Sequence, residues 1–187
     1  MSRFMRPATL IDSEHLTLIT RRLCYQLIEN HNDFSNTAIL GLQPRGVAYA
    51  RRIQKTLQEI LPGQEILLGN LDITFHRDDF RRRETPLVPN QTEVNFLVEG
   101  KDVILVDDVF YTGRTIRAGM DAMLSFGRPA SVELLVLIDR RFQRQLPIAP
   151  TYIGRSVDSY DNQRVEVKLD TEGEGKVLLY TTPQSNE

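Results

Sequence analysis

The fold of this chain is indicated by the stretch Val103-Ile104-Leu105-Val106-Asp107-Asp108-Val109-Phe110-Tyr111-Thr112-Gly113-Arg114-Thr115. It opens as an apolar run, which predicts a buried strand, and it continues into two adjacent carboxylates. A short turn with two hydroxyls and one glycine follows, and then a helical pattern begins. Backbone N–H groups at the start of a helix bind phosphate groups, helped by the helix dipole. The stretch therefore predicts a strand–turn–helix unit that suits a sugar phosphate.

The polar side chains of this stretch suit the same ligand. Asp107 and Asp108 can accept hydrogen bonds from vicinal ribose hydroxyls or face a hydrated Mg²⁺ ion. Thr112 and Thr115 add hydroxyl donors, and Gly113 lets the backbone approach closely. The alternative is an ordinary strand-to-helix turn whose acids cap the helix. Each feature alone fits that alternative, whereas the joint pattern favours a ligand site.

The joint pattern closely resembles the phosphoribosyl-diphosphate (PRPP) motif of type I phosphoribosyltransferases. The residues from Asp108 to Thr115 are most similar to the PyrR family, whose members combine regulation of pyrimidine operons with uracil phosphoribosyltransferase activity. The resemblance implies an α/β protein with the type I phosphoribosyltransferase fold, in which helices flank a central, mostly parallel sheet. Residues 1–187 would form a single phosphoribosyltransferase domain, with a small hood built from the N-terminal helix and the C-terminal hairpin.

Composition sets broad limits on the class of protein. The 187 residues suffice for one domain with a real core, and 41% hydrophobic with 26% charged residues is typical of soluble globular proteins. A net charge of −2 does not indicate binding to nucleic acid or to membranes over the whole surface. The single cysteine, Cys24, excludes an intrachain disulfide and a multi-cysteine metal cluster. We expect a cytoplasmic protein.

Apolar periodicity predicts alternating strands and helices along the chain. Helices are expected at residues 13–29 and 47–60 and from the motif turn to residue 126. Strands are expected at residues 37–42, 65–76, 93–98, 103–106, 131–138 and 151–154, and a terminal hairpin at 164–169 and 176–181. This alternation predicts a parallel sheet, whose ligands bind outside the carboxyl ends of its strands.

Two further segments resemble the parts of a PRPP site that hold the diphosphate. Arg45 and Gly46 lie in a strand-to-helix turn like the family's pyrophosphate loop, where the arginine offers a fork of donors and the glycine permits close approach. Arg77 begins a charged segment, residues 77–91, that matches the position of the family's flexible loop. By this resemblance Arg77 reaches the diphosphate. The alternative is a solvated charged loop, and the sequence leaves its conformation open.

Two other positions resemble the part of the site that recognises the base. Arg140 stands where relatives place a basic residue against the exocyclic oxygen of the base. Tyr152 and Ile153 resemble a base-binding segment in which an aromatic ring stacks on the base and a backbone group pairs with its edge. Packing at the edge of the core is the alternative for Tyr152.

The resemblance implies the transfer of phosphoribose from PRPP to uracil, which gives UMP and diphosphate. Asp107, Asp108 and Arg77 are the implied catalytic residues, and Mg²⁺ is the implied cofactor, contacted by Asp107 and Asp108 indirectly through water or substrate. The residues implied to bind the 5′-phosphate are Val109, Phe110, Tyr111, Thr112, Gly113, Arg114 and Thr115. The implied assembly is a homodimer or an oligomer built from dimers.

Two alternative functions stay open. A purine phosphoribosyltransferase would use the same PRPP site, and Arg140 and Tyr152 fit either kind of base. The chain could instead act mainly on the leader of an mRNA, as an RNA-binding attenuation protein with weak enzyme activity. RNA-binding members carry a histidine and a lysine where this chain has Tyr25 and Gln43. The arginines that could form a basic patch are Arg21, Arg22, Arg141, Arg144 and Arg155.

Overall fold

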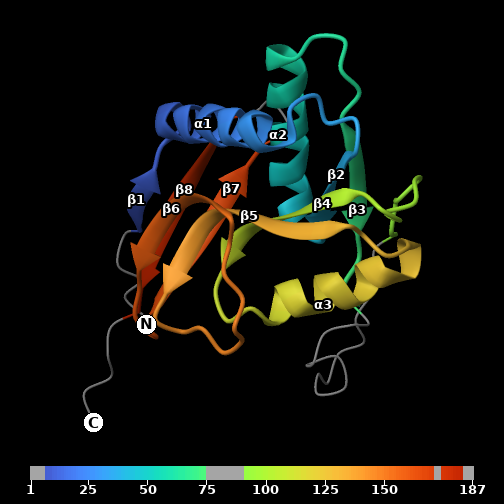
Figure 1. The fold of residues 1–187 in the computed structure, drawn as a ribbon. Coiled ribbons are helices and arrows are strands. Elements are labelled where there is room, and N and C mark those ends of the chain that lie inside the picture. Colours follow the sequence, from blue (N-terminus) through green and yellow to red (C-terminus); the bar gives the residue numbers. More distant parts are fainter. Residues whose placement is uncertain (1–6, 75–90, 171–173, 183–187) are drawn as a thin grey trace.

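A five-stranded parallel sheet forms the centre of the protein (Figure 1). The computed structural model describes residues 7–74, 91–170 and 174–182. The order of the strands across the sheet is β3-β2-β4-β5-β6. Their bounds are β2 Thr37–Leu42, β3 Leu67–Leu71, β4 Asp102–Phe110, β5 Ser131–Arg141 and β6 Tyr152–Asp158. This sheet confirms the predicted α/β class.

The middle of the sheet is apolar on both faces. All residues of β2 are buried, as are the apolar residues 103–106 of β4 and 134–138 of β5. Such continuous apolar runs are typical of parallel strands covered by helices on both sides. The motif strand, β4, is the central strand in this order, and its carboxyl end lies at the middle of one edge of the sheet.

Helices cover the two faces of the sheet unequally. The helices α1 (Ser13–His31) and α2 (Gly46–Ile60) pack on one face, and α3 (Arg114–Met123) lies on the other (Figure 1). A short 3₁₀ turn, Leu124–Phe126, follows α3. The sheet separates two apolar clusters, one under α1 and α2 and one under α3. Among the described residues, no helix combines the length and apolar character needed to cross a membrane.

A second, antiparallel sheet lies beside α1 and has the order β1-β8-β7. Its hairpin, β7 (Gln163–Leu169) and β8 (Gly175–Thr181), matches the hairpin predicted from the sequence. The third strand, β1 (Ala8–Ile11), pairs with β8 and was not predicted. A strand of four residues that pairs with the opposite end of the chain leaves little local pattern to find.

Two predicted strands differ from the structure. The strand predicted at residues 65–76 is limited to β3, Leu67–Leu71. Residues 93–98 form no strand and contribute one isolated antiparallel bridge, between Glu93 and Asn70. The first helix agrees with its prediction, because the Asp12 side chain accepts a hydrogen bond from the His15 N–H and caps α1.

Candidate active site

Asp107 and Asp108 lie buried at the carboxyl end of β4. Only 6% and 5% of their surfaces are exposed. Each carboxylate is held by the backbone that follows it: the Asp108 N–H donates to Asp107 Oδ1 at 2.9 Å, and the Val109 N–H donates to Asp108 Oδ1 at 2.8 Å. One oxygen of each acid is therefore engaged locally, and the acids are fixed as a pair.

Burial makes both acids costly to ionise. Burial, followed by the neighbouring Asp108 charge, raises the pKa of Asp107 well above its usual range. Burial also raises the pKa of Asp108, against the opposing effect of the nearby Arg45 guanidinium. Among the described residues, no group of three or more His, Cys, Asp or Glu side chains could hold a metal ion. A cation at this pair would therefore take most of its ligands from water or from a substrate.

Gly46 lets the start of α2 press against β4 at the acid pair. A Cβ atom on Gly46 would lie 2.4 Å from the Val106 carbonyl oxygen and 3.0 Å from Asp107 Cα. Real Cβ atoms do not approach backbone this closely, so the contact requires glycine. Arg45 directly precedes α2 and is exposed. The structure thus brings the predicted diphosphate residues, Arg45 and Gly46, to the predicted acids.

The turn between β4 and α3 is the segment predicted to bind the phosphate, and we call it the cradle. Gly113 precedes α3 in a left-handed conformation, with a φ of 95°, which favours glycine. Gly113 has no side chain to cap α3, and the Arg114 N–H donates to Thr112 Oγ1 at 3.3 Å. The first N–H groups of a helix lack partners within the helix, so an uncapped start suits an anion. The cradle comprises Tyr111, Thr112, Gly113, Arg114 and Thr115.

A segment that the sequence did not single out holds this cradle from outside. We call residues 142–148, which follow β5, the strap. Arg144 donates to the Tyr111 carbonyl oxygen and, at 2.6 Å, to Asp139 Oδ1. Its guanidinium also lies 3.5 Å from the centre of the Phe110 ring. Arg144 therefore ties the end of β5 to the end of β4.

The strap makes a second set of contacts at the start of α3. The Gln145 N–H donates to the Thr112 carbonyl oxygen at 3.0 Å, and Arg114 Nε donates to Gln145 Oε1 at 2.7 Å. Leu146 lies 3.3 Å from where a Cβ atom on Gly113 would be. These bonds engage a carbonyl group and a side chain of the cradle and none of its backbone N–H groups.

Arg140 reaches the cradle from the end of β5. Its side chain is 8% exposed, and its guanidinium lies 4.0 Å from the centre of the Tyr111 ring. Nε donates to Ser159 Oγ at 2.8 Å, and Nη2 donates to the Gln163 carbonyl oxygen at 2.9 Å. The connection between β6 and β7 therefore meets the predicted base-binding arginine beside the predicted phosphate site.

Comparison with known proteins agrees with this arrangement. The model of the phosphoribosyl transferase domain matches residues 9–172. A protein of Desulfosudis oleivorans named "Bifunctional protein PyrR" is 41% identical, over 91% of this chain and 94% of its own length. Proteins of the same name from Listeria monocytogenes and Deinococcus radiodurans are 40% and 39% identical, over 93% and 92% of this chain and 96% and 94% of their own lengths. The chain belongs to the PyrR family.

Solved structures support the type I phosphoribosyltransferase fold of this PyrR-family chain. The hypoxanthine-guanine phosphoribosyltransferase of Leishmania tarentolae, in complex with GMP, has a TM-score of 0.66 at 16% identity, covering 100% of this chain and 99% of that one. The hypoxanthine phosphoribosyltransferase of Trypanosoma cruzi, in complex with IMP, also has a TM-score of 0.66, at 13% identity, with 98% and 94% covered. At this level of identity the likeness shows the fold alone.

Tyr152 and Ile153, the residues predicted to contact the base, are the first two residues of β6 in this PyrR-family chain. They pair with Leu135 and Val136 of β5, and Val136 pairs in turn with Asp107 of β4, so Ile153 lies level with Asp107 across the parallel sheet. The Ile153 carbonyl oxygen accepts a hydrogen bond from Arg22 Nη2 at 3.0 Å. The base contact predicted for these two residues stays a prediction.

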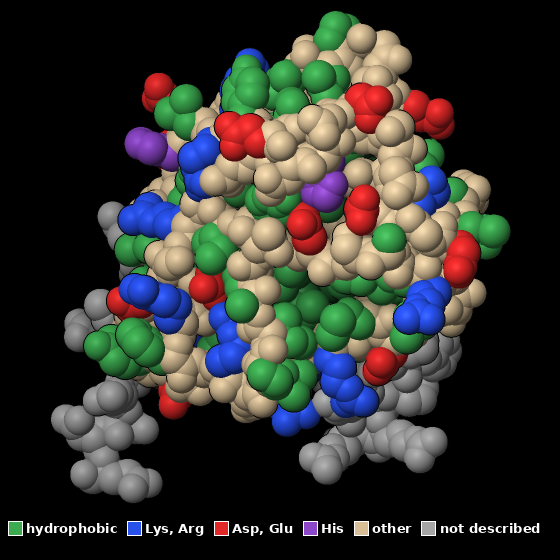
Figure 2. Space-filling view, in the orientation of Figure 1, with side chains coloured by type: hydrophobic (Ala, Val, Ile, Leu, Met, Phe, Trp, Pro, Cys, Tyr) green, Lys and Arg blue, Asp and Glu red, His purple; other side chains and the backbone are tan. Residues whose placement is uncertain are grey.

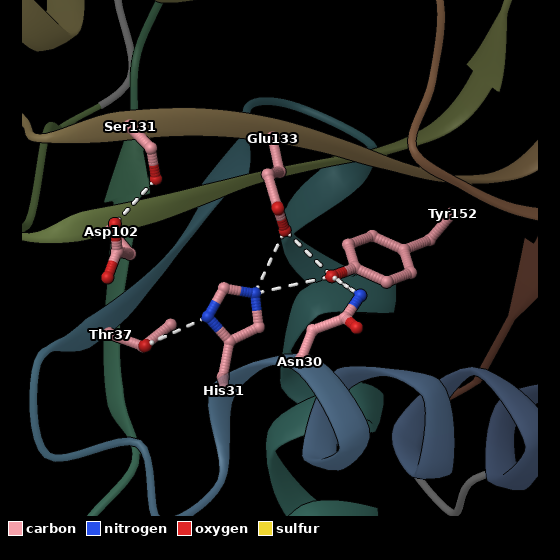
Figure 3. Close-up of polar contacts among 7 residues, drawn as sticks. All are labelled: Asn30, His31, Thr37, Asp102, Ser131, Glu133 and Tyr152. Atoms are coloured by element: carbon pink, nitrogen blue, oxygen red, sulfur yellow. Dashed lines mark hydrogen bonds and ion pairs between the residues drawn. The ribbon is translucent and has the colours of Figure 1, made fainter.

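The Tyr152 hydroxyl belongs to a polar network that joins α1 to the sheet (Figure 3). It donates to Glu133 Oε2 at 2.7 Å and accepts from Asn30 Nδ2 at 2.8 Å. His31 Nε2 lies 2.9 Å from the same Glu133 oxygen, and its Nδ1 lies 3.1 Å from Thr37 Oγ1. Burial raises the pKa of Tyr152 to about 12. The tyrosine is therefore a neutral structural residue.

Packing also explains the glycine that follows these two residues. A Cβ atom on Gly154 would lie 2.4 Å from the Leu137 carbonyl oxygen and 3.1 Å from Ile19 of α1. The Tyr152-Ile153-Gly154 sequence thus lets α1 lie close to β6.

The two hydrogen-bond partners of Arg140, Ser159 and Gln163, line an open cleft. This cleft has a volume of about 820 Å³, within the usual size range of ligand pockets. It is lined by Phe142, Gln143, Ser159, Tyr160, Asp161, Asn162, Gln163, Thr181 and Thr182. Arg77, the remaining predicted site residue, lies outside the described residues.

We expect Asp107→Asn to stabilise the protein at neutral and alkaline pH. Because the folded-state pKa of Asp107 is raised, the folded protein binds this proton more tightly than the unfolded chain does. The wild type should therefore lose stability as the pH rises from the unfolded pKa through the folded one. Asparagine keeps the acceptor for the Asp108 N–H without the charge, for a gain of about 1 kcal/mol in the free energy of unfolding.

Urea unfolding at pH 5 and pH 8 measures this gain, which should be larger at pH 8. The control is Asp121→Asn, an exposed acid on α3 paired with Arg117, which should change stability little at either pH. An equal loss of stability at both pH values in Asp107→Asn would contradict a strained acid pair.

We expect Tyr152→Leu to reduce stability without weakening the binding of a nucleobase. The substitution removes the hydroxyl that joins Asn30 to Glu133, at a cost of about 2 kcal/mol in the free energy of unfolding. Urea unfolding and steady-state kinetics, at a temperature where the variant is folded, measure the two effects. A raised KM for the base together with unchanged stability would instead support stacking of the Tyr152 ring on the base.

Proposed function

We propose that this protein transfers the phosphoribosyl group of PRPP to N1 of uracil, giving UMP and diphosphate. The observation that carries the proposal is the shared location of three groups in a PyrR-family chain. A buried acid pair, an uncapped helix start and a nearly buried arginine meet at the carboxyl edge of the central strands. Acids suit a ribose, the helix start suits its phosphate, and the arginine suits a base carbonyl.

The acid pair suits the charge that develops during the transfer. The bond from the anomeric carbon to the diphosphate oxygen breaks, the bond to N1 of uracil forms, and the N1 proton leaves to solvent. The sugar passes through an oxocarbenium-like state, as in glycoside hydrolysis. Asp107 and Asp108, already fixed by backbone N–H groups, can accept hydrogen bonds from the ribose hydroxyls and stabilise that positive charge.

The phosphate groups have separate partners. The 5′-phosphate is proposed to bind the N–H groups of the cradle and the hydroxyls of Thr112 and Thr115. Arg45, directly before α2, is proposed to grip the diphosphate. Positioning of the two reactants then accounts for much of the rate, because no covalent intermediate with the protein is needed.

Mg²⁺ is the proposed cofactor. Burial raises the pKa of Asp107 and of Asp108, and the Arg45 guanidinium opposes this shift only in part, which fits a further positive charge such as a divalent cation. The described residues offer no further acidic or histidine ligands beside the pair, so substrate oxygens and water would complete the coordination. When bound, the ion neutralises charge on the departing diphosphate.

Arg140 is proposed to donate a hydrogen bond to a carbonyl group of the base. Purine bases such as hypoxanthine also carry a carbonyl group, and the two solved relatives described above act on purines. Their sequence identity of 13–16% supports only a shared fold, whereas the relatives at about 40% identity belong to the PyrR family. Family membership therefore favours uracil.

A panel of bases tests this choice directly. The purified protein is incubated with PRPP, Mg²⁺ and one of uracil, hypoxanthine or guanine, and nucleotide products are separated and quantified. UMP formation with little IMP or GMP is expected. Preferential formation of a purine nucleotide would show that the proposed substrate is wrong.

We expect Asp108→Asn to slow uracil phosphoribosyl transfer about 10²–10³-fold in kcat/KM, as is typical when one preorganised charge contact is lost. The asparagine keeps the acceptor for the Val109 N–H, so the fold should be retained. The matched control is Asp102→Asn at the opposite end of β4, where the acid pairs with Ser131. Wild-type turnover by Asp108→Asn would remove the acid from the mechanism.

We also propose a second function, the regulation of pyrimidine genes through a leader RNA in response to UMP. Its support is the family, whose relatives carry the name "Bifunctional protein PyrR". The surface support is weaker: Arg22, Arg144 and Arg155 donate to backbone carbonyl groups, and Arg141 pairs with Asp158. On the face shown in Figure 2, Lys and Arg side chains are interspersed with acidic and apolar ones.

RNA binding by the proposed mode should weaken steeply with salt, because contacts to phosphates release counterions. We expect the affinity for the leader RNA of the cell's own pyrimidine genes to rise with UMP and to fall by at least about tenfold between 50 and 200 mM salt. Filter binding across a salt series, with an unrelated RNA of equal length as control, measures both effects. Equal affinity for the two RNAs would contradict a regulatory role.

A further inference from the structure

Arg140 and its neighbour Arg141 are held in different ways. Arg141 is half exposed and forms an ion pair with Asp158, with 2.6 Å between Nε and Oδ1. Arg140 is nearly buried, and no described residue forms an ion pair with it. Its partners are two neutral oxygens, Ser159 Oγ and the Gln163 carbonyl. A buried guanidinium without a carboxylate keeps its charge available for a polar ligand.

The geometry leaves one edge of this guanidinium for a ligand. Nε donates to Ser159, and one hydrogen of Nη2 donates to Gln163. The Tyr111 ring covers one face of the plane, with 4.0 Å from its centre to Cζ. Nη1 has no hydrogen-bond partner among the residues that the structure describes. Two bonds in the plane and one contact on the face prevent rotation of the group, so the direction of the Nη1 hydrogens is set.

Ser159 supplies the side-chain part of this anchor. It follows β6 directly and is 1% exposed, so water does not replace its hydroxyl. The other in-plane bond, to Gln163, uses a backbone oxygen that any residue would provide. The orientation of Arg140 therefore depends on the identity of residue 159 more than on that of residue 163.

We infer that Ser159 is a positioning residue, which fixes Arg140 so that the protein accepts a base with a carbonyl group and rejects one with an amino group at the same place. The inference rests on the proposed function. A guanidinium only donates hydrogen bonds and does not lose its proton. A carbonyl oxygen on the base accepts a hydrogen bond from Nη1. The amino group of cytosine is itself a donor, so it would point at the donors of Nη1 and form no hydrogen bond with them. A fixed Arg140 therefore selects uracil over cytosine.

The test compares Ser159→Ala with Ser159→Thr and with Ser156→Ala. Ser156 is an exposed serine of β6, so the same substitution there should leave kinetics unchanged. For Ser159→Ala we expect the KM for uracil to rise about tenfold while the KM for PRPP stays unchanged, since a lost hydrogen bond to a charged group weakens only the base contact. Threonine, which keeps the hydroxyl, should restore the KM for uracil. The preference for uracil over cytosine, measured as a ratio of kcat/KM, should fall in parallel.

Three outcomes would overturn the inference. Ser159→Ala could retain the wild-type KM for uracil and the wild-type preference over cytosine. It could also raise the KM for uracil and PRPP equally together with a loss of stability in urea, which indicates a merely structural role. In both cases the wild type still forms UMP, and Arg140→Gln should still raise the KM for uracil, so the proposed function stands. A wild type that forms no UMP would overturn the function and this inference together.

Discussion

The structure depends on keeping two adjacent carboxylates out of water at the end of its central strand. Moving a carboxylate into a protein interior costs free energy unless it is paired. Asp107 and Asp108 lie almost fully buried, and burial raises the pKa of both. Their surroundings offset only part of this cost, through two backbone N–H groups and the field of Arg45. The protein therefore gives up stability at the place where a positively charged sugar is proposed to form.

The rest of the site follows from this central position. Gly46 brings the start of α2 against β4, so Arg45 and Gly46, which are proposed to hold the diphosphate, lie beside the acids. The cradle continues directly from the same strand, and Arg140 approaches it from the neighbouring strand. Each proposed ligand group would thus meet a different element, and all of these elements come together at one edge of one sheet. Binding of the complete substrate can offset the cost that no single element offsets alone.

The sequence was sufficient for those parts of the site whose residues are adjacent in the chain. The strand, the acid pair and the cradle form one continuous stretch, and Arg45 with Gly46 form another, so local pattern predicted both. The polar network of Tyr152 was missed because its partners, Asn30 and Glu133, lie on other elements of the chain. The strap and Ser159 were missed because they act through contacts between separate segments, such as Gln145 to Thr112 and Ser159 to Arg140. The strand β1 was missed because its partner, β8, lies at the other end of the described chain.

This pairing of β1 with β8 has a consequence for biosynthesis. The strand β1 leaves the ribosome before any other described element, yet the strand it pairs with is the last one that the structure describes. The central sheet can assemble while translation continues, because each of its strands pairs with others that lie between α1 and β7 in the chain. The small sheet closes only after β8 is released, so the nascent protein carries an unpaired β1 edge until then.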